Sequence, residues 1–281
     1  MLSLLFLSVS LYSQTIGLES ADENDTNLFI ADKKRVIDEC VLNIQYRMFY
    51  VKDVKNPDKR KSYYMELQIG KQISKFSDYQ RLKIDSLEEV YMEQKLDGIQ
   101  AINKISPLGF GTSPLNIFKN YPAEKITVTD IVPLSENFKY TEPKIKPIWK
   151  IWQENRTICG YVCKKATTTY RGRHYTAWYT PKIPYSDGPW KFWGLPGLIL
   201  KVSDDKNEYI FECATIKKPK KNEVIYIKDI DYYSTTRERF NRAVKDFYQN
   251  PGPMFESKGV TVDGKPITIK SLPYNPIELS E

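Results

Sequence analysis

Histidine occurs only once in this sequence of 281 residues, at His174. Any Ser/His or Cys/His catalytic pair would have to use this single imidazole, which we expect on one face of a strand over residues 172–180. The G-x-S-x-G, H-E-x-x-H, P-loop and dinucleotide-binding patterns are also missing. We therefore expect no catalytic residue, no cofactor and no metal site, and we favour a protein that is not an enzyme.

Long hydrophobic runs are missing as well, so the sequence predicts no transmembrane helix. The apolar run over residues 1–13 is too short to span a bilayer and ends in small residues, which is typical of a secretory signal peptide. Residues 14–34 are polar and acidic, and we expect a flexible leader there. Residues 35–281 would then form a single domain, exported to the periplasm, the outer membrane or the cell surface.

Charge of one sign is not concentrated anywhere in the chain. The 42 basic and 35 acidic residues are interspersed and leave a net charge of +7. Dispersed charge in an exported protein argues against nucleic-acid binding. An anionic partner, such as a membrane surface or a polysaccharide, stays compatible with this charge.

Cysteine is scarce, with four residues at Cys40, Cys159, Cys163 and Cys213. An even number in an exported protein predicts structural disulfides. If residues 157–169 form one strand, Cys159 and Cys163 lie on the same face roughly 13 Å apart, which is too far for a mutual bridge. Each would then pair with Cys40 or Cys213, in an order that the spacing leaves open.

Most of the recognisable secondary-structure patterns in the sequence are those of β-strands. Apolar and polar residues alternate over residues 40–50, and short connections between later strands favour antiparallel neighbours. Further strands are expected near residues 62–69, 125–131, 138–142, 147–153, 157–169, 172–180, 198–204 and 208–216.

Two segments have helical spacing. One helix is predicted over residues 79–97, with Leu82, Leu87 and Val90 in its apolar stripe, and another begins after the N-cap Thr235. We therefore expect an α+β fold: one long, curved, mainly antiparallel, meander-like β-sheet with one or two helices packed on it.

The most informative segment is Gly188-Pro-Trp-Lys-Phe-Trp-Gly-Leu-Pro-Gly-Leu-Ile-Leu-Lys-Val202. Its glycines and prolines fix a tight bend ahead of a hydrophobic strand. Together with Ile158–Ala166 and Tyr170–Tyr179, this segment resembles the GLPGLI family, secreted proteins of the Bacteroidetes that are named for the hexapeptide Gly194–Ile199. The resemblance implies an exported protein and brings no established activity with it.

All five tryptophans lie between residues 149 and 193. These rings either line a pocket for an acyl chain, a sugar or an apolar peptide, or form the core with the Gly/Pro loop as a plug. Cationic side chains nearby either hold a ligand's acidic group or pair with Glu208 or Glu212 across the sheet. The candidate ligand- or partner-binding residues are Arg171, Arg173, Trp178, Trp190, Lys191, Phe192, Trp193, Gly194, Leu195, Pro196 and Gly197.

The leading hypothesis is an exported, non-enzymatic binding protein of the cell envelope. Its aromatic loop would hold a lipid, a glycan or an apolar peptide, or a component of the outer-membrane transport apparatus. A purely structural interaction protein without a pocket is the first alternative, and a hydrolase of unknown type is the second. An internal pocket would favour ligand binding, whereas an exposed aromatic patch would favour the structural protein.

Overall fold

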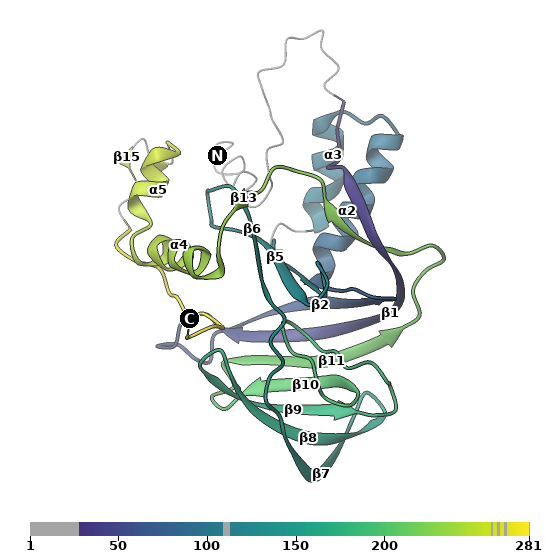
Figure 1. Ribbon diagram of the computed structural model, residues 1–281. Helices are drawn as coiled ribbons and strands as arrows, with labels where there is room; N and C mark the ends of the chain where they lie inside the picture. Colours follow the sequence, from purple (N-terminus) through teal and green to yellow (C-terminus); the bar gives the residue numbers. More distant parts are fainter. Residues whose placement is uncertain (1–27, 109–112, 260, 263–264, 267–268, 281) are drawn as a thin grey trace.

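The fold is organised around one large open β-sheet (Figure 1). The computed structural model describes residues 28–108, 113–259, 261–262, 265–266 and 269–280. Within them the sheet has 13 strands, and all its strand pairs are antiparallel except β6 with β13. The expectation of a long, mainly antiparallel sheet is confirmed. Beside four described helices, the sheet makes up a larger part of the fold than the α+β class implies.

The elements have the following bounds. The strands are β1 (Lys34–Val51), β2 (Arg60–Gly70), β3 (Ser74–Asp78), β4 (Asn116–Lys119), β5 (Lys125–Ile131), β6 (Asn137–Pro143), β7 (Lys150–Ile158), β8 (Tyr161–Tyr170), β9 (Arg173–Thr180), β10 (Leu198–Asp204), β11 (Tyr209–Lys217), β12 (Val224–Lys228) and β13 (Tyr233–Ser234). A separate small pair consists of β14 (Thr261–Val262) and β15 (Lys265–Pro266). The helices are α2 (Tyr79–Glu93), α3 (Gly98–Ile105), α4 (Arg237–Gln249), α5 (Gly252–Ser257) and the 3₁₀ turn η1 (Ser106–Leu108).

Strand β1 joins two meanders into one sheet. Strands β2 to β6 follow one another on one side of β1, and β11 back to β7 follow one another on the other side. The 18 residues of β1 pair with β12 in their first part and with β11 in their second part. Tyr46, in the middle of β1, is fully buried, and its hydroxyl donates to the carbonyl of Ile199 at 2.6 Å. The centre of the sheet is therefore tied to the start of β10.

The first helical region differs from its prediction. α2 ends at Glu93, before the end of the helix predicted over residues 79–97. A second helix, α3, which was not predicted from the sequence, begins after the N-cap Asp97 in a capping box with Gln100. Val90, expected to be buried, is 40% exposed, whereas Asp85 is buried. An ion-paired acidic residue thus anchors α2 where the helical spacing suggested an apolar stripe.

The partners of Asp85 explain this docking. Its carboxylate pairs with Arg81 and Lys228 and accepts from the hydroxyl of Tyr226 at 2.8 Å. Burial alone would raise the pKa of Asp85, but the two cations lower it to about 2. The apolar pattern did not predict which face of α2 is buried, because the ion pairs of Asp85 determine that face.

The described part of the predicted leader, residues 28–34, packs against the rest of the protein. Phe29 and Ala31 are buried against Ala101 of α3, and the amide of Phe29 donates to the carbonyl of Leu96 at 2.8 Å. β1 then begins at Lys34, so residues 28–34 do not form a flexible segment. The predicted signal peptide, residues 1–13, lies outside the described residues.

Residues 157–169 are not one strand. Cys159 and Gly160 form the turn between β7 and β8, with φ of 50° and 79°. The 13 Å separation expected of Cys159 and Cys163 on one strand therefore does not apply. All four cysteines are free: the thiol of Cys159 lies 3.2 Å from the carbonyl oxygen of Cys213, and that of Cys40 lies 3.1 Å from Oδ1 of Asn43.

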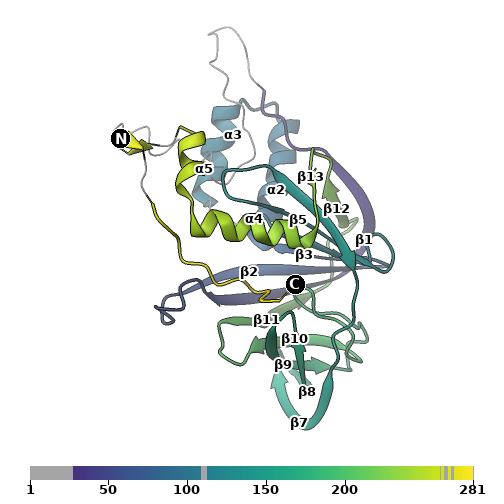
Figure 2. The same cartoon turned by 60° about the vertical axis from the view of Figure 1, so that its left-hand side comes forward.

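α4 packs on the sheet beside β6 (Figure 2). Its N-cap is Thr236, one residue later than expected, and this side chain accepts from the amide of Arg239. Phe240 is buried, with its ring 5.6 Å from those of both Phe138 and Tyr140. The predicted amphipathic helix is thus confirmed, and it covers the sheet face that carries the pocket described below.

Gly197 sits where no side chain fits. Its φ is +140°, and a Cβ built there would lie 2.2 Å from the carbonyl oxygen of Thr180. We expect Gly197→Ala to lower the free energy of unfolding by more than about 2 kcal/mol, because backbone strain and a clash with main-chain atoms add. Urea denaturation followed by circular dichroism measures this change.

The matched control is Gly98→Ala at the start of α3, where nothing lies within 4 Å of the added Cβ. We expect this change to be neutral or to stabilise by up to about 1 kcal/mol, since alanine favours helix. Equal unfolding midpoints for the two variants would contradict the role given to Gly197.

Candidate functional site

The aromatic loop between β9 and β10 is largely built into the core. Trp190 is 3%, Phe192 0% and Leu195 1% exposed. The ring of Phe192 packs edge-on against Tyr175 at 4.7 Å and against Trp190 at 5.1 Å. Of the two interpretations weighed above, the plug describes most of this loop.

Polar contacts hold the loop in one position. The buried amine of Lys119 donates to the carbonyl of Gly188 at 2.5 Å and forms an ion pair with Asp187. On the other side, the indole of Trp149 donates to the carbonyl of Trp193 at 2.8 Å. The loop is therefore preorganised from both ends, and Trp190 is held with φ of +50°.

Lys191 lies at the centre of a buried ionic cluster, defined here as Lys191, Arg171, Arg237, Glu142 and Glu278. Its amine is 2.7 Å from Glu142 and 2.5 Å from Glu278, and it donates to the hydroxyl of Tyr140 at 3.2 Å. Burial alone would lower the pKa of Lys191, but the surrounding oxygens raise it above its usual value. Lys191 therefore stays charged.

Two arginines complete the ionic cluster. Arg237 of α4 contacts Glu278 at 2.9 Å and Glu142 at 3.2 Å, and Arg171 contacts Glu142 at 2.7 Å. Both oxygens of Glu278 are thereby held by cations, Oε1 by Lys191 and Oε2 by Arg237. The pKa of Glu278 is lowered, because these partners outweigh the effect of burial.

Arg173 has its own acidic partners. Its guanidinium contacts Asp204 at 3.0 Å and Glu208 at 2.7 Å, and it also donates to Asn275 and to the carbonyl of Pro276. The pairing of Arg173 with Glu208 was one of the two expected alternatives. The chain's own carboxylates thus occupy all three cations that we considered for an acidic ligand group: Lys191, Arg171 and Arg173.

These cations also fix residues 272–280, an extended segment without helix or strand that we call the C-terminal segment. Asn275 donates to the carbonyl of Val51 at 2.8 Å, and the amide of Leu279 donates to the carbonyl of Arg171 at 2.8 Å. Figure 2 shows the yellow trace running from α5 down to the sheet. The segment thereby closes one side of the space between α4 and the sheet.

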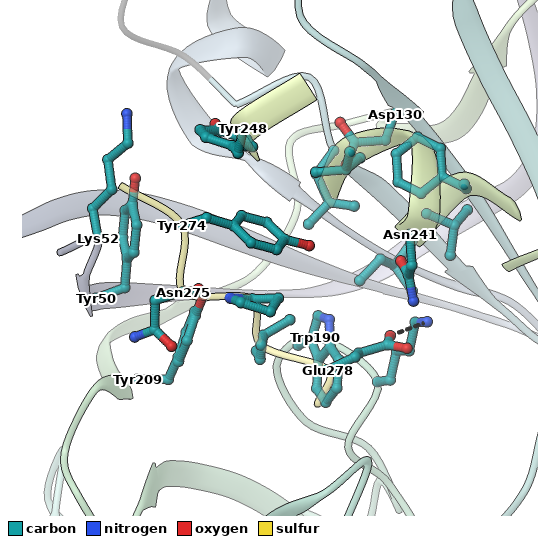
Figure 3. A pocket seen from close by; sticks show the side chains of 18 of the residues that line it. Tyr50, Lys52, Asp130, Trp190, Tyr209, Asn241, Tyr248, Tyr274, Asn275 and Glu278 are labelled. Atoms are coloured by element: carbon teal, nitrogen blue, oxygen red, sulfur yellow. Dashed lines mark hydrogen bonds and ion pairs between the residues drawn. The ribbon is translucent and has the colours of Figure 1, made fainter. Parts of the chain in front are cut away.

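That space is a pocket with a volume of about 240 Å³ (Figure 3). β5, β6 and the loop form its floor, α4 lies over it, and the C-terminal segment flanks it. Its lining residues are Tyr50, Lys52, Leu115, Ile117, Val128, Asp130, Tyr140, Trp190, Lys191, Tyr209, Phe240, Asn241, Val244, Tyr248, Pro273, Tyr274, Asn275, Pro276, Ile277 and Glu278. Seven of these are aromatic, so the pocket is mainly apolar with a few polar groups.

Asp130 is the unusual member of this lining. It lies on the same face of β5 as Val128, and its Oδ1 accepts only from the amide of the next residue, Ile131, at 2.8 Å. Burial raises the pKa of Asp130 to about 7. No basic side chain among the described residues pairs with it.

Only Trp190 and Lys191 of the predicted binding residues line this pocket. Arg171 and Arg173 support it through their ion pairs, and Phe192, Leu195 and Gly197 are buried around it. Trp178 lies elsewhere, under the guanidinium of Arg156, and Trp193, Gly194 and Pro196 are partly or fully exposed. The structure therefore divides the predicted set between pocket wall, core and surface.

His174 is exposed and hydrogen-bonds the hydroxyl of Thr169 at 2.8 Å, away from the pocket residues. In the part of the chain that the structure describes, no cluster of three or more acidic, cysteine or histidine side chains is arranged for a metal ion. Among the same residues, no helix has the length and apolarity needed to cross a bilayer.

Sequence reasoning missed the acidic half of the site. Asp130 had a readable signal, since it occupies the apolar face of the predicted strand 125–131 in register with Ile126 and Val128. Glu142 similarly shares a strand face with Tyr140. Glu278 gave no signal, because the C-terminal segment has no periodicity.

Comparison with known proteins adds little. A family described as a protein of unknown function (Porph_ging), associated with the Bacteroidetes, matches residues 171–201, which include the hexapeptide Gly194–Ile199. No curated protein matches the chain. Two solved structures, described as "Structure of PNGF-II in P21 space group" and "Structure of PNGF-II in C2 space group", give TM-scores of 0.47 and 0.46 at 16% and 17% identity. Each match covers 74% of this chain but only 34% and 33% of the other.

Glu142 pairs with three cations of the ionic cluster, so we predict that it stabilises the fold. We expect Glu142→Gln to lower the free energy of unfolding by about 3–5 kcal/mol, because it leaves three buried cations with one carboxylate. Adding Lys191→Met should recover part of this loss, since it restores the original charge balance. Chemical denaturation of both variants measures the difference.

Glu212→Gln is the control, because Glu212 is 43% exposed and forms its ion pair with the partly exposed Lys201. We expect a change of at most about 1 kcal/mol there. A Glu142→Gln variant as stable as this control would show that the cluster does not hold the site together.

Proposed function

We propose that this protein binds a small amphipathic ligand in the pocket beneath α4 and does so without catalysing a reaction. The observation that carries the proposal is the preformed pocket, whose wall includes Trp190 and Lys191 of the Gly/Pro loop. Mainly apolar cavities with a few placed polar groups are the usual form of small-molecule sites. The Gly/Pro loop contributes its buried side to the wall of the pocket.

The volume sets the size of the ligand. A dry cavity of roughly 150 Å³ accepts benzene, and drug-sized ligands occupy roughly 300–1,000 Å³. At about 240 Å³, this pocket fits one aromatic ring with a short side chain. A lipid, glycan or peptide would therefore enter with one ring, residue or headgroup only.

A hydrolase needs more than this pocket offers. The pocket does contain two carboxyl groups whose pKa values are shifted apart, Asp130 upward and Glu278 downward. Such pairs accompany acid–base catalysis. Both oxygens of Glu278 are committed to Lys191 and Arg237, however, so Glu278 is unsuited to act as a base or nucleophile. Asp130 alone does not make a catalytic pair.

A second candidate function, protein–protein interaction, draws on the edge strand β7. Nearly all of β7 is exposed, and apolar side chains gather around it: Ile148 is 90%, Ile151 52% and Trp152 38% exposed. Exposed apolar groups on an unpaired strand edge favour pairing with another chain. This surface is separate from the pocket, so both functions are compatible.

We also propose that the protein is exported, because of the sequence pattern of residues 1–13 and the resemblance to the GLPGLI family.

A further part of the proposal is a disulfide between Cys159 and Cys213. The thiol of Cys159 donates to the carbonyl oxygen of Cys213 at 3.2 Å, and burial together with the neighbouring Cys159 raises the pKa of Cys213. A bridge there would fasten the β7–β8 turn to β11.

Ligand binding is tested with 2-phenylethanol, a neutral probe of matching size, by saturation-transfer NMR. We expect binding to the intact protein and at least a tenfold loss in Val244→Trp, because the larger ring fills the pocket from α4. Val162→Trp adds the same side chain at an exposed position of β8 and should leave binding unchanged. Equal signals from all three proteins would refute a site beneath α4.

The disulfide is tested by treating the folded protein with oxidised glutathione. We expect a loss of two hydrogens by mass spectrometry, with Cys159 and Cys213 protected from alkylation. Cys159→Ser should abolish the bridge, whereas Cys40→Ser should not. A bridge that includes Cys40 would refute this pairing.

A further inference from the structure

We propose that the pocket selects a protonated amine attached to an aromatic body, and that the carboxylate of Asp130 binds this ammonium group. The ligand class is a small arylalkylamine. This inference rests on the proposed function, since it assigns the ligand chemistry of the same pocket.

The charges around the pocket point to a cation. Lys191 and Glu278 neutralise each other, and Tyr140 supplies a further contact to Lys191. Lys52 lies at the other end of the pocket from Asp130, near the ring of Tyr248 (Figure 3). Lys52 and Asp130 are thus the lining charges without an ion-pair partner among the described side chains. Lys52 lies over the ring of Tyr248, whereas a ligand ammonium would supply the partner of Asp130.

The shape of the pocket fits the rest of such a ligand. Asp130 lines the pocket together with Val128 of the same strand, and Asn241 of α4 lies at the same end of the pocket (Figure 3). Its Oδ1 accepts from the amide of Ile131, which leaves Oδ2 for a donor from the pocket. Aromatic side chains on several elements present surfaces that attract both an aryl ring and an ammonium group.

The pKa of Asp130, about 7, makes binding depend on pH. An ammonium binds the ionised carboxylate, so affinity should rise as the pH rises from 5.5 to 8.5. The other groups facing the pocket do not produce this profile: the pKa values of Tyr140, Tyr209 and Lys191 are raised, that of Tyr274 is raised to about 12, and that of Glu278 is lowered. Lys52 lies at the other end of the pocket from Asp130 (Figure 3).

The experiment compares three probes that share one ring and differ in the headgroup: 2-phenylethylamine, 2-phenylethanol and phenylacetate. Dissociation constants are measured by isothermal titration calorimetry between pH 5.5 and 8.5. At pH 8 we expect the amine to bind at least tenfold more tightly than the alcohol, and phenylacetate to bind most weakly. In Asp130→Asn, the advantage of the amine and its pH dependence should both disappear.

The folding of the variant has an independent readout. A carboxyl whose pKa is raised on folding costs stability as the pH rises from its ordinary value of 3.8 toward 7. Asp130→Asn should therefore raise the melting temperature at pH 8 and leave it unchanged at pH 3. Asp205→Asn, on an exposed turn, serves as the control and should alter neither binding nor its pH profile.

Two outcomes would overturn the inference. If 2-phenylethanol binds beneath α4 as tightly as the amine, or if Asp130→Asn retains the amine preference, the headgroup assignment fails while the proposed function stands. If neither the amine nor the alcohol binds, the proposed function fails together with it.

Discussion

The ionic cluster around Lys191 is the interaction on which the pocket depends. It draws together the aromatic loop, β6, α4 and the C-terminal segment, four elements that are far apart in the sequence. Apolar contacts alone would let these elements slide against one another, whereas directional ion pairs fix one arrangement. Burying five charged groups is costly, and a buried ionic cluster is weak evidence of added stability. Its value here lies in positioning the walls of the pocket.

Ion pairs within the protein explain why the basic residues near the aromatic loop do not make an anion site. Lys191, Arg171 and Arg173 are close to the aromatic residues, as the sequence suggested, but each is already neutralised by glutamate or aspartate from another element. In the pocket itself, Asp130 has no basic partner among the described side chains. Pairing within the protein thus neutralises the positive charge that the local sequence implies.

Much of the sheet was predictable because alternation is a local property. β5, β9 and β10 have nearly the expected bounds, and the antiparallel order follows from short connections. β1 contains the predicted strand 40–50 but begins earlier, at Lys34. β4 and β12 were missed because they are only four and five residues long. The buried face of α2 was predicted wrongly, because an aspartate in a helix is expected to face solvent. Asp85 is buried only because Lys228 and Tyr226, which are distant in the sequence, lie beside it. The site was only partly predictable for the same reason: Trp190 belongs to a recognisable motif, but Glu278 acquires its role through contacts over long sequence separations.

The hydrogen bond between Asn275 and Val51 spans 224 residues. Contacts this distant in the chain close only late in folding, because the entropy of ordering the intervening chain must first be offset by other contacts. The C-terminal segment flanks the pocket, so the pocket is completed only as the whole molecule folds. A partly folded intermediate that has the sheet but not this segment would lack one wall of the pocket, so the ligand binding that we propose would be coupled to completion of the native state.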